Sequence, residues 1–293
     1  MTGNLLTGMS TNREVRIYVA ETSEMVASAQ KTHDLSPMST AALGRTITGA
    51  AMMGMMSKIE KEKLTLQIKG SGEIQLMVAV ADTKGHVKAY TSEPHASLQT
   101  NDLGKIAVGQ AVGKEGQVVV IRDMGMKDPF IGQSDLVSGE IAEDLTYYFG
   151  QSEQQATAIG LGVFLTPDAR VKSAGGFLVQ LLPEASEATI EQLESNLSGM
   201  KSITQLFEEG LTIEQIAGQV FAGLGLDELE RYPLYYQCDC SKEKMGAGLK
   251  SLGKSTLTEI LTEDGGAELT CHFCNTKYQF SRNDLKTLIE SMA

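Results

Sequence analysis

Two closely spaced cysteine pairs near the end of the chain are the residues whose types and spacing point most directly to a chemistry. Cys238 and Cys240 form a C-x-C pair, Cys271 and Cys274 form a C-x-x-C pair, and thirty residues separate the two pairs. Zinc binds four soft ligands at tetrahedral angles, and two tight pairs on two turns provide such a set. The chain has no other cysteine. The spacing therefore predicts one zinc site in which these four sulfurs are the ligands.

The same sulfurs are able to react with oxidants. Zinc holds cysteine ligands as thiolates, the nucleophilic form of the side chain, and Lys242, Lys244 and Lys277 add positive charge nearby in the sequence. Peroxide or hypochlorite converts a thiolate into a sulfenic acid, which a neighbouring thiolate captures as a disulfide, and the metal then leaves. We expect the C-x-x-C pair to react first, because a C-x-C ring departs further from relaxed disulfide geometry. The alternative is a purely structural zinc site.

A second motif lies between the cysteine pairs. Residues 248–255 match the phosphate-loop pattern G-x-x-x-x-G-K-[ST]. A functional phosphate loop follows a buried strand and opens a helix, whereas no strand is predicted before Gly248. We therefore expect a flexible loop that leads into a helix, without nucleotide binding.

Few other residues suggest catalysis. Three histidines are scattered through predicted turns, and His272 lies between two expected zinc ligands, where it is an alternative ligand. Met52, Met53, Met55 and Met56 are interpreted as core residues, with an adaptable client-binding surface as the alternative. No nucleophile–base arrangement is visible. We expect a protein that is not an enzyme, with no catalytic residue and no cofactor other than zinc.

The first 183 residues carry a mixed pattern of helices and strands. Strands are expected over 13–20, 64–69, 74–81, 86–91, 118–122 and 177–182, and helices over about 40–58, 138–149 and 152–162. In residues 64–69 the apolar side chains alternate with polar ones, as in a half-buried strand. The short connections between 64–69, 74–81 and 86–91 predict an antiparallel meander.

After residue 183 the sequence pattern changes from mixed helices and strands to short helices. Three segments fit the S/T-x-x-E/Q capping box, at 189–192, 202–205 and 212–215, and apolar residues follow each at helical spacing. Three such short helices must pack on the core or on a partner. Further on we expect a helix over 255–261, a hairpin over 271–280 and a terminal helix capped by Ser281. The predicted domains are a core at 1–183, a helical linker at 184–231 and a zinc-binding redox-switch domain at 232–293.

Composition narrows the classes of partner. The 293 residues have a net charge of −12, aromatic residues make up 5 %, and tryptophan is absent. This balance argues against broad binding to nucleic acid or to an anionic membrane. The most apolar run, 47–56, is about half the roughly 20 residues that a membrane helix needs, and no secretory signal is visible. We expect a cytoplasmic protein.

The cysteine pattern, together with several core segments, resembles the redox-regulated heat-shock chaperonin family of the thirty-three-kilodalton class. The resemblance runs from near Val15 to the terminal helix. The matching stretches are Leu43-Gly-Arg-Thr46, Leu64-Thr-Leu-Gln-Ile-Lys-Gly70, Leu136-Val-Ser-Gly-Glu-Ile-Ala-Glu-Asp-Leu145, Tyr147-Tyr-Phe149 followed by Ser152-Glu-Gln154, and Ala174-Gly-Gly176 before Gln180.

The resemblance implies an α+β protein with a mixed α/β core domain, a helical linker and a small C-terminal zinc domain. It implies an ATP-independent holdase of the stress response, dormant when reduced with zinc on Cys238, Cys240, Cys271 and Cys274. Oxidation would form the disulfides Cys238–Cys240 and Cys271–Cys274, release zinc, unfold the linker and expose binding sites for unfolding client proteins. The oxidised form is expected to be a homodimer, and the reduced form a monomer or a domain-swapped dimer.

Two other hypotheses compete with that of a redox-regulated holdase. The first is a zinc-ribbon interaction protein that binds a protein or nucleic acid and whose zinc is purely structural; the net charge of −12 counts against nucleic acid. The second is a dithiol oxidoreductase that uses Cys271 and Cys274. The sequence around these cysteines lacks the βαβ pattern that such enzymes show.

Overall fold

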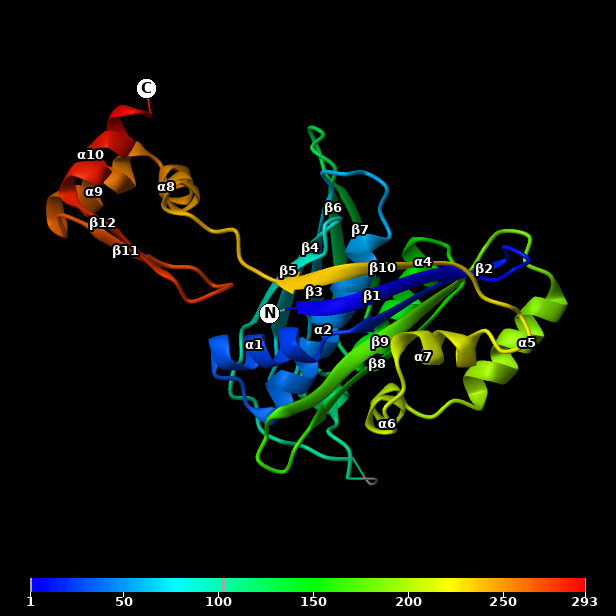
Figure 1. Cartoon of the computed structure of the whole chain (residues 1–293). Coiled ribbons are helices and arrows are strands. Elements are labelled where there is room, and N and C mark those ends of the chain that lie inside the picture. Colours follow the sequence, from blue (N-terminus) through cyan, green and yellow to red (C-terminus); the bar gives the residue numbers. More distant parts are fainter. Residues whose placement is uncertain (1, 102–103, 293) are drawn as a thin grey trace. The chain divides into compact units, whose positions relative to one another are not determined.

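The structure is a computed structural model that describes residues 2–101 and 104–292, and it divides into two compact units at 1–237 and 238–293. Over the described residues the first unit contains a ten-stranded sheet (Figure 1) with the order β7-β6-β3-β4-β5-β10-β1-β2-β9-β8. Its strands are β1 (Thr2–Met9), β2 (Val15–Glu21), β3 (Lys63–Lys69), β4 (Leu76–Asp82), β5 (His86–Thr91), β6 (Gln117–Asp123), β7 (Phe130–Asp135), β8 (Thr157–Leu165), β9 (Val171–Leu181) and β10 (Asp227–Tyr236).

The predicted meander is confirmed. β3 pairs with β4 and β4 pairs with β5, both antiparallel. Leu64, Leu66 and Ile68 of β3 are buried, as their alternation with polar residues predicts. β5 is parallel only to β10, so the sheet is mixed. With the helices described below, this arrangement confirms the α+β fold class.

The sheet has an apolar core on each face, because successive side chains of a strand point to opposite sides. Leu5 of β1 belongs to the larger core, and its neighbour Leu6 belongs to the smaller one. The larger core is formed with α1 (Ser23–His33), α2 (Pro37–Met55), α3 (Val108–Val112) and α4 (Ile141–Ser152). Ser36 caps α2 by accepting the backbone N–H of Ser39, and Pro37 opens the helix.

The smaller core lies beneath three short helices, α5 (Glu187–Ser198), α6 (Ile203–Glu208) and α7 (Ile213–Val220). Figure 1 shows α6 and α7 near β8 and β9, and α5 further out, beyond α7. The capping boxes at Ser202 and Thr212 are confirmed. The box at Thr189 is wrong: α5 starts earlier, Ser186 is its N-cap, and Thr189 lies buried inside the helix.

One predicted helix is a strand. Residues 152–162 were expected to be helical, but α4 ends at Ser152 and β8 begins at Thr157. β8 pairs antiparallel with β9 from Thr157 to Leu165. The polar residues before Thr157 suit a helix, whereas Thr157, Ile159 and Val163 suit a strand. Pairing with β9 makes this segment a strand, and a local sequence pattern carries no information about that pairing.

The linker and the core are joined by a strand that sequence patterns did not reveal. β10 pairs antiparallel with β1 and parallel with β5, and most of its residues are exposed. The first compact unit therefore extends through β10 to Gln237 and includes α5–α7. This two-part division is coarser than the three domains expected from the sequence, whose boundaries stay a prediction.

The second unit, 238–293, has its own small core. It contains α8 (Lys242–Ser251), α9 (Lys254–Glu263), the hairpin of β11 (Ala267–Thr270) and β12 (Lys277–Phe280), and α10 (Arg282–Glu290). Ser281 caps α10, as predicted. The flexible loop expected around Gly248 is wrong, because Gly248 lies within α8. No strand of the unit precedes it, so the context of a phosphate loop is missing.

Within the described ranges, no helix combines the length and the apolarity needed to cross a membrane. The Met-rich segment belongs mainly to the core: Met52 and Met53 are fully buried, and Met55 and Met56 are half-buried. This agrees with the interpretation of these residues as core.

Candidate metal centre

The two cysteine pairs lie in two loops of the second unit. Cys238 and Cys240 follow β10 and precede α8, whose N-cap is Ser241. Cys271 and Cys274 lie in the loop of the β11–β12 hairpin. In that loop the carbonyl of Cys271 accepts the N–H of Asn275 at 2.8 Å, and Asn275 has a φ of 57°. A tight turn of this kind brings the two sulfurs of the pair to one side.

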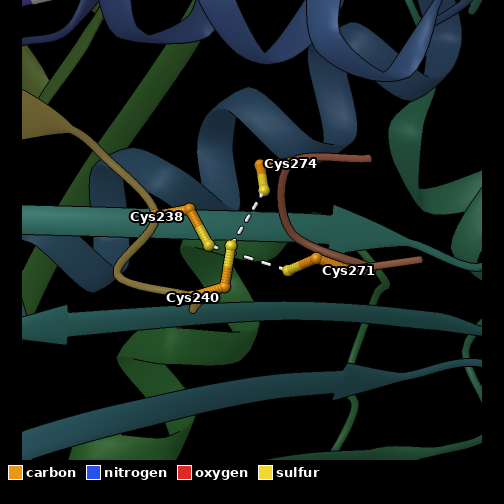
Figure 2. Close-up of side chains that lie close together, drawn as sticks. All are labelled: Cys238, Cys240, Cys271 and Cys274. Atoms are coloured by element: carbon orange, nitrogen blue, oxygen red, sulfur yellow. Dashed lines mark hydrogen bonds between the residues drawn. The ribbon is translucent and has the colours of Figure 1, made fainter. Parts of the chain in front are cut away.

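The four sulfurs form one cluster (Figure 2). All of them lie within 4.8 Å of one another. The short contacts join the two loops: Cys238 Sγ lies 3.7 Å from Cys271 Sγ, and Cys240 Sγ lies 3.3 Å from Cys274 Sγ. All four cysteines are free thiols. Among the described residues this group contains the four cysteines and excludes His272.

The cluster fits zinc by ligand type and by spacing. Four sulfurs placed about 2.3 Å from a tetrahedral zinc ion would lie roughly 3.8 Å apart. The two short contacts, 3.3 and 3.7 Å, lie below this value, and all four sulfurs lie within 4.8 Å of one another. An all-cysteine set is also the donor set of a structural zinc site. The four residues are therefore suited to hold one ion.

The electrostatics of the cluster also favour a cation. Burial raises the pKa of the Cys238 and Cys271 thiols above the ordinary value. Burial opposes ionisation of Cys274 as well, but hydrogen bonds with Thr276 and with neighbouring thiols lower its pKa to about 7. Four neighbouring thiolates repel one another unless a positive charge lies between them. A divalent cation would provide that charge.

Two hydroxyl groups contact the cluster, and sequence reasoning missed both. The hydroxyl of Tyr278, on β12, lies 3.0 Å from Cys240 Sγ, and the hydroxyl of Thr276 lies 3.2 Å from Cys274 Sγ. The bond to Cys240 raises the pKa of Tyr278 to about 12. Alternation along the chain from Thr276 into β12 could have indicated that Thr276 and Tyr278 share a side of the hairpin. It could not have indicated which sulfur each one meets.

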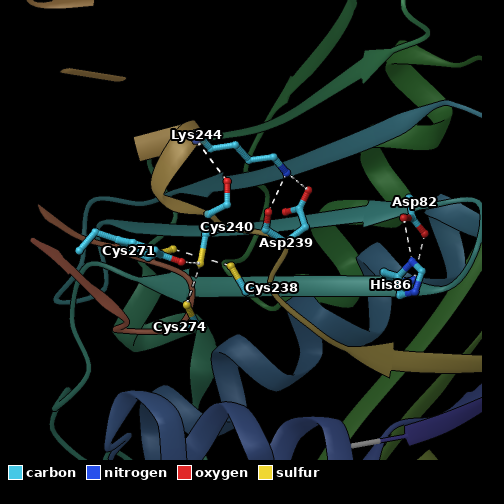
Figure 3. A network of polar contacts seen from close by, with 10 residues as sticks. Asp82, His86, Cys238, Asp239, Cys240, Lys244, Cys271 and Cys274 are labelled. Carbon is cyan, nitrogen blue, oxygen red and sulfur yellow. Dashed lines mark hydrogen bonds and ion pairs between the residues drawn. The ribbon is translucent and has the colours of Figure 1, made fainter. Parts of the chain in front are cut away.

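The three lysines near the cysteines are paired with carboxylates. Figure 3 shows Lys244, whose Nζ lies 2.6 Å from Asp239 Oδ2 and 2.7 Å from the Asp239 carbonyl. Lys242 pairs with Asp284 and Lys277 pairs with Glu268, each at 3.0 Å. The positive charge expected to act on the sulfurs is thus largely offset by these partners.

Two of the remaining histidines, His86 and His95, each lie near an aspartate. His86 Nδ1 lies 3.0 Å from Asp82 Oδ2, four residues away on the same hairpin, a pair that Figure 3 also shows. His95 lies 3.9 Å from Asp34 and is largely exposed. Neither histidine belongs to the group of metal-ligating residues found in the described part of the chain.

Comparison with known proteins agrees with this geometry. The family model described as Hsp33 protein matches residues 3–281. The chain belongs to the Hsp33 family. The 33 kDa chaperonin of Ruminiclostridium cellulolyticum is 47 % identical over 276 residues, which cover 94 % of each chain. That of Alkaliphilus metalliredigens is 40 % identical over 292 residues, which cover 100 % of each chain.

A solved structure of the Hsp33 family has the same fold. The crystal structure of the 33 kDa chaperonin, a heat shock protein 33 homologue, from Thermotoga maritima matches with a TM-score of 0.89 and 37 % identity over 98 % of each chain. The resemblance stated from the sequence motifs is thereby confirmed. Membership of the Hsp33 family supports a chaperone function for this chain.

Proposed function

We propose that this Hsp33 family member is a redox-regulated, ATP-independent holdase that binds unfolding proteins under oxidative stress. The observation that carries the proposal is the convergence of four free thiols from two loops within 4.8 Å. A cluster of this kind is both a zinc site and an oxidation target. Family membership supports the chaperone activity, and the cluster supports its control by oxidation. We place the protein in the cytoplasm, where thiols stay reduced between episodes of stress.

Cys238, Cys240, Cys271 and Cys274 would hold the zinc ion, which when bound supplies the positive charge that keeps four sulfurs ionised and close together. The second unit depends on the zinc ion to join its two cysteine loops, because its own core is small. Its fully buried or nearly buried apolar side chains are Leu249, Leu257, Phe280 and Leu285. Oxidation of the sulfurs to Cys238–Cys240 and Cys271–Cys274 would remove the link between the two loops and loosen the unit.

The client-binding surface that we propose lies beneath α5–α7. Val15, Ile17 and Val19 of β2 are fully buried against these helices, within a cluster of thirteen buried residues. The helices are short, and short helices depend on packing for their stability. Strand β10 connects α7 to Cys238 along the chain. Loosening of the second unit would free the chain after β10, and release of α5–α7 would expose a broad apolar face of the sheet.

Charge makes this release easier. Residues 184–231 contain ten acidic and two basic side chains. Some of the acidic groups are paired with cations, as Glu208 is with Lys172 at 3.4 Å and Glu209 with Lys201. The remaining excess of negative charge weakens the docking of the helices and keeps them soluble once released. We propose that the oxidised form is a dimer.

The decisive experiment follows light scattering from a heat-unfolding client in the presence of reduced or peroxide-treated protein. A chromogenic chelator reports zinc in the same samples. We expect suppression of aggregation only after oxidation, with release of one zinc per chain. Zinc release without any suppression would refute the holdase, and equal suppression by the reduced protein would refute redox control. Cys271→Ser should respond to peroxide far less than Lys244→Ala.

A further inference from the structure

The two sulfurs of the Cys238/Cys240 pair differ in their hydrogen-bond donors. Cys240 Sγ contacts the phenol hydroxyl of Tyr278 at 3.0 Å. Cys238 Sγ accepts the backbone N–H of Cys240 instead. A thiolate can only accept a hydrogen bond, so the phenol is the donor whenever Cys240 is ionised. A phenol is also a stronger donor than a backbone amide, because its proton is more acidic.

The position of this phenol is set by the fold of the hairpin. Tyr278 lies on β12 opposite Leu269 of β11, and its ring is half-buried against the small core of the second unit. The hydroxyl is therefore held near Cys240 by the register of the strands and by the packing of the ring. Solvent exposure does not distinguish the two cysteines, since Cys238 and Cys240 are both half-buried.

We propose that Tyr278 is a positioning residue that makes Cys240 the less reactive sulfur of its pair, so that Cys238 attacks the oxidant first. A hydrogen bond to a thiolate withdraws electron density, and nucleophilicity falls with basicity. Second-shell donors of this kind also raise the affinity of a site for its metal. This inference rests on the proposed oxidation of the cluster and assigns a role to each sulfur within it.

The proposed reaction with hydrogen peroxide has two steps. The Cys238 thiolate attacks one oxygen of the peroxide, the O–O bond breaks, hydroxide leaves, and Cys238 becomes a sulfenic acid. The Cys240 thiolate then attacks the Cys238 sulfur, the S–O bond breaks, a second hydroxide leaves, and the disulfide forms. Two thiolates are oxidised and one peroxide is reduced to two hydroxide ions.

The test compares wild type with Tyr278→Phe, which keeps the ring and removes the hydroxyl. Reduced, zinc-loaded, full-length protein is treated briefly with N-ethylmaleimide, and fragment mass spectra measure labelling at Cys238 and at Cys240. We expect wild type to be labelled mainly at Cys238. In Tyr278→Phe we expect labelling of Cys240 relative to Cys238 to rise by about tenfold, with a zinc affinity about 10-fold weaker. Tyr147→Phe on α4 is the matched control.

A second variant guards against a folding defect in Tyr278→Phe. Thr276→Val removes the hydroxyl that contacts Cys274 at 3.2 Å, and it should raise labelling of Cys274 without changing the Cys238/Cys240 ratio. In the Co²⁺-loaded proteins, loss of either hydroxyl should shift the sulfur-to-metal charge-transfer absorption. An unchanged Cys238/Cys240 labelling ratio in metal-bound Tyr278→Phe would overturn the proposal. No client is present in these measurements, so failure of the holdase in light scattering is a separate result.

Discussion

Cys240 Sγ lies 3.3 Å from Cys274 Sγ although 34 positions separate the two residues in the chain. The other short contact, between Cys238 and Cys271, also joins the two loops. The reduced cluster thus brings together sulfurs of different pairs. The disulfides implied by resemblance to the Hsp33 family join sulfurs of the same pair. The two pairings have opposite consequences: bonds between the loops would lock them together, and bonds within each pair would let them separate.

We predict that peroxide produces the disulfides within each pair. Each pair closes a ring of only a few residues, so its two sulfurs stay close after the loops separate. Non-reducing digestion followed by mass spectrometry identifies the linked peptides. A protein that forms mainly Cys240–Cys274 and Cys238–Cys271 would keep its loops linked, and the proposed release of α5–α7 would then be incorrect.

Removal of the metal under reducing conditions should unfold the second unit alone. A structural zinc site contributes about 10–16 kcal/mol to the folding of a small domain, whereas the core of this unit has four buried apolar residues. We expect a strong chelator to make residues 238–293 sensitive to trypsin while the sheet of the first unit resists. Limited proteolysis followed by mass spectrometry measures this sensitivity to trypsin. Addition of zinc, but not of calcium, should restore protection from trypsin. If residues 238–293 resist trypsin without metal, the prediction is wrong.

Weakening the docking of α7 should activate the protein without oxidation. Ile216 of α7 is fully buried in the smaller core, and Ile216→Ala removes about 2–5 kcal/mol of packing. We expect the reduced variant to suppress aggregation of a heat-unfolding client. Gln219→Ala, an exposed position on the same helix, is the matched control. Light scattering checks the activity, and hydrogen exchange of residues 187–220 checks the loosening. An Ile216→Ala protein with loosened helices and no activity would place the client surface elsewhere.

The buried carboxyl of Asp144 should make the stability of the first unit depend on pH. Burial raises the pKa of Asp144, although its Oδ1 accepts the backbone N–H groups of Val137, Ser138 and Gly139. A raised folded-state pKa favours the folded protein at low pH, below the ordinary value near 3.8, and this contribution is lost as the pH rises through the folded-state value.

The variant Asp144→Asn tests this, because it cannot ionise. The free energy of unfolding of wild type, relative to that of Asp144→Asn, should therefore fall between pH 4 and pH 7. Urea unfolding followed by circular dichroism measures the difference. Glu143→Gln, exposed in the same helical turn, should show a smaller change with pH. A difference that stays constant or grows with pH would mean that the carboxyl is not destabilised by burial.

Local patterns predicted the elements whose stability is local. The meander of β3, β4 and β5 follows from alternation and short connections, and α6 and α7 follow from their capping boxes. The sulfur set follows from cysteine spacing, because two tight pairs need little chain ordering to meet. The meander, the capped helices and each cysteine pair depend on residues that are close to one another in the chain, and a sequence contains that information directly.

The remaining features depend on partners far along the chain. Strand β8 was expected to be a helix, and it is a strand because β9 pairs with it. Strand β10 had no clear local signal, and it lies between β1 and β5, more than a hundred residues earlier. The sequence alone determined which four sulfurs meet and the family to which the chain belongs. Only the tertiary structure decided that the Tyr278 hydroxyl contacts Cys240, because strand register places that hydroxyl and no local pattern encodes the register.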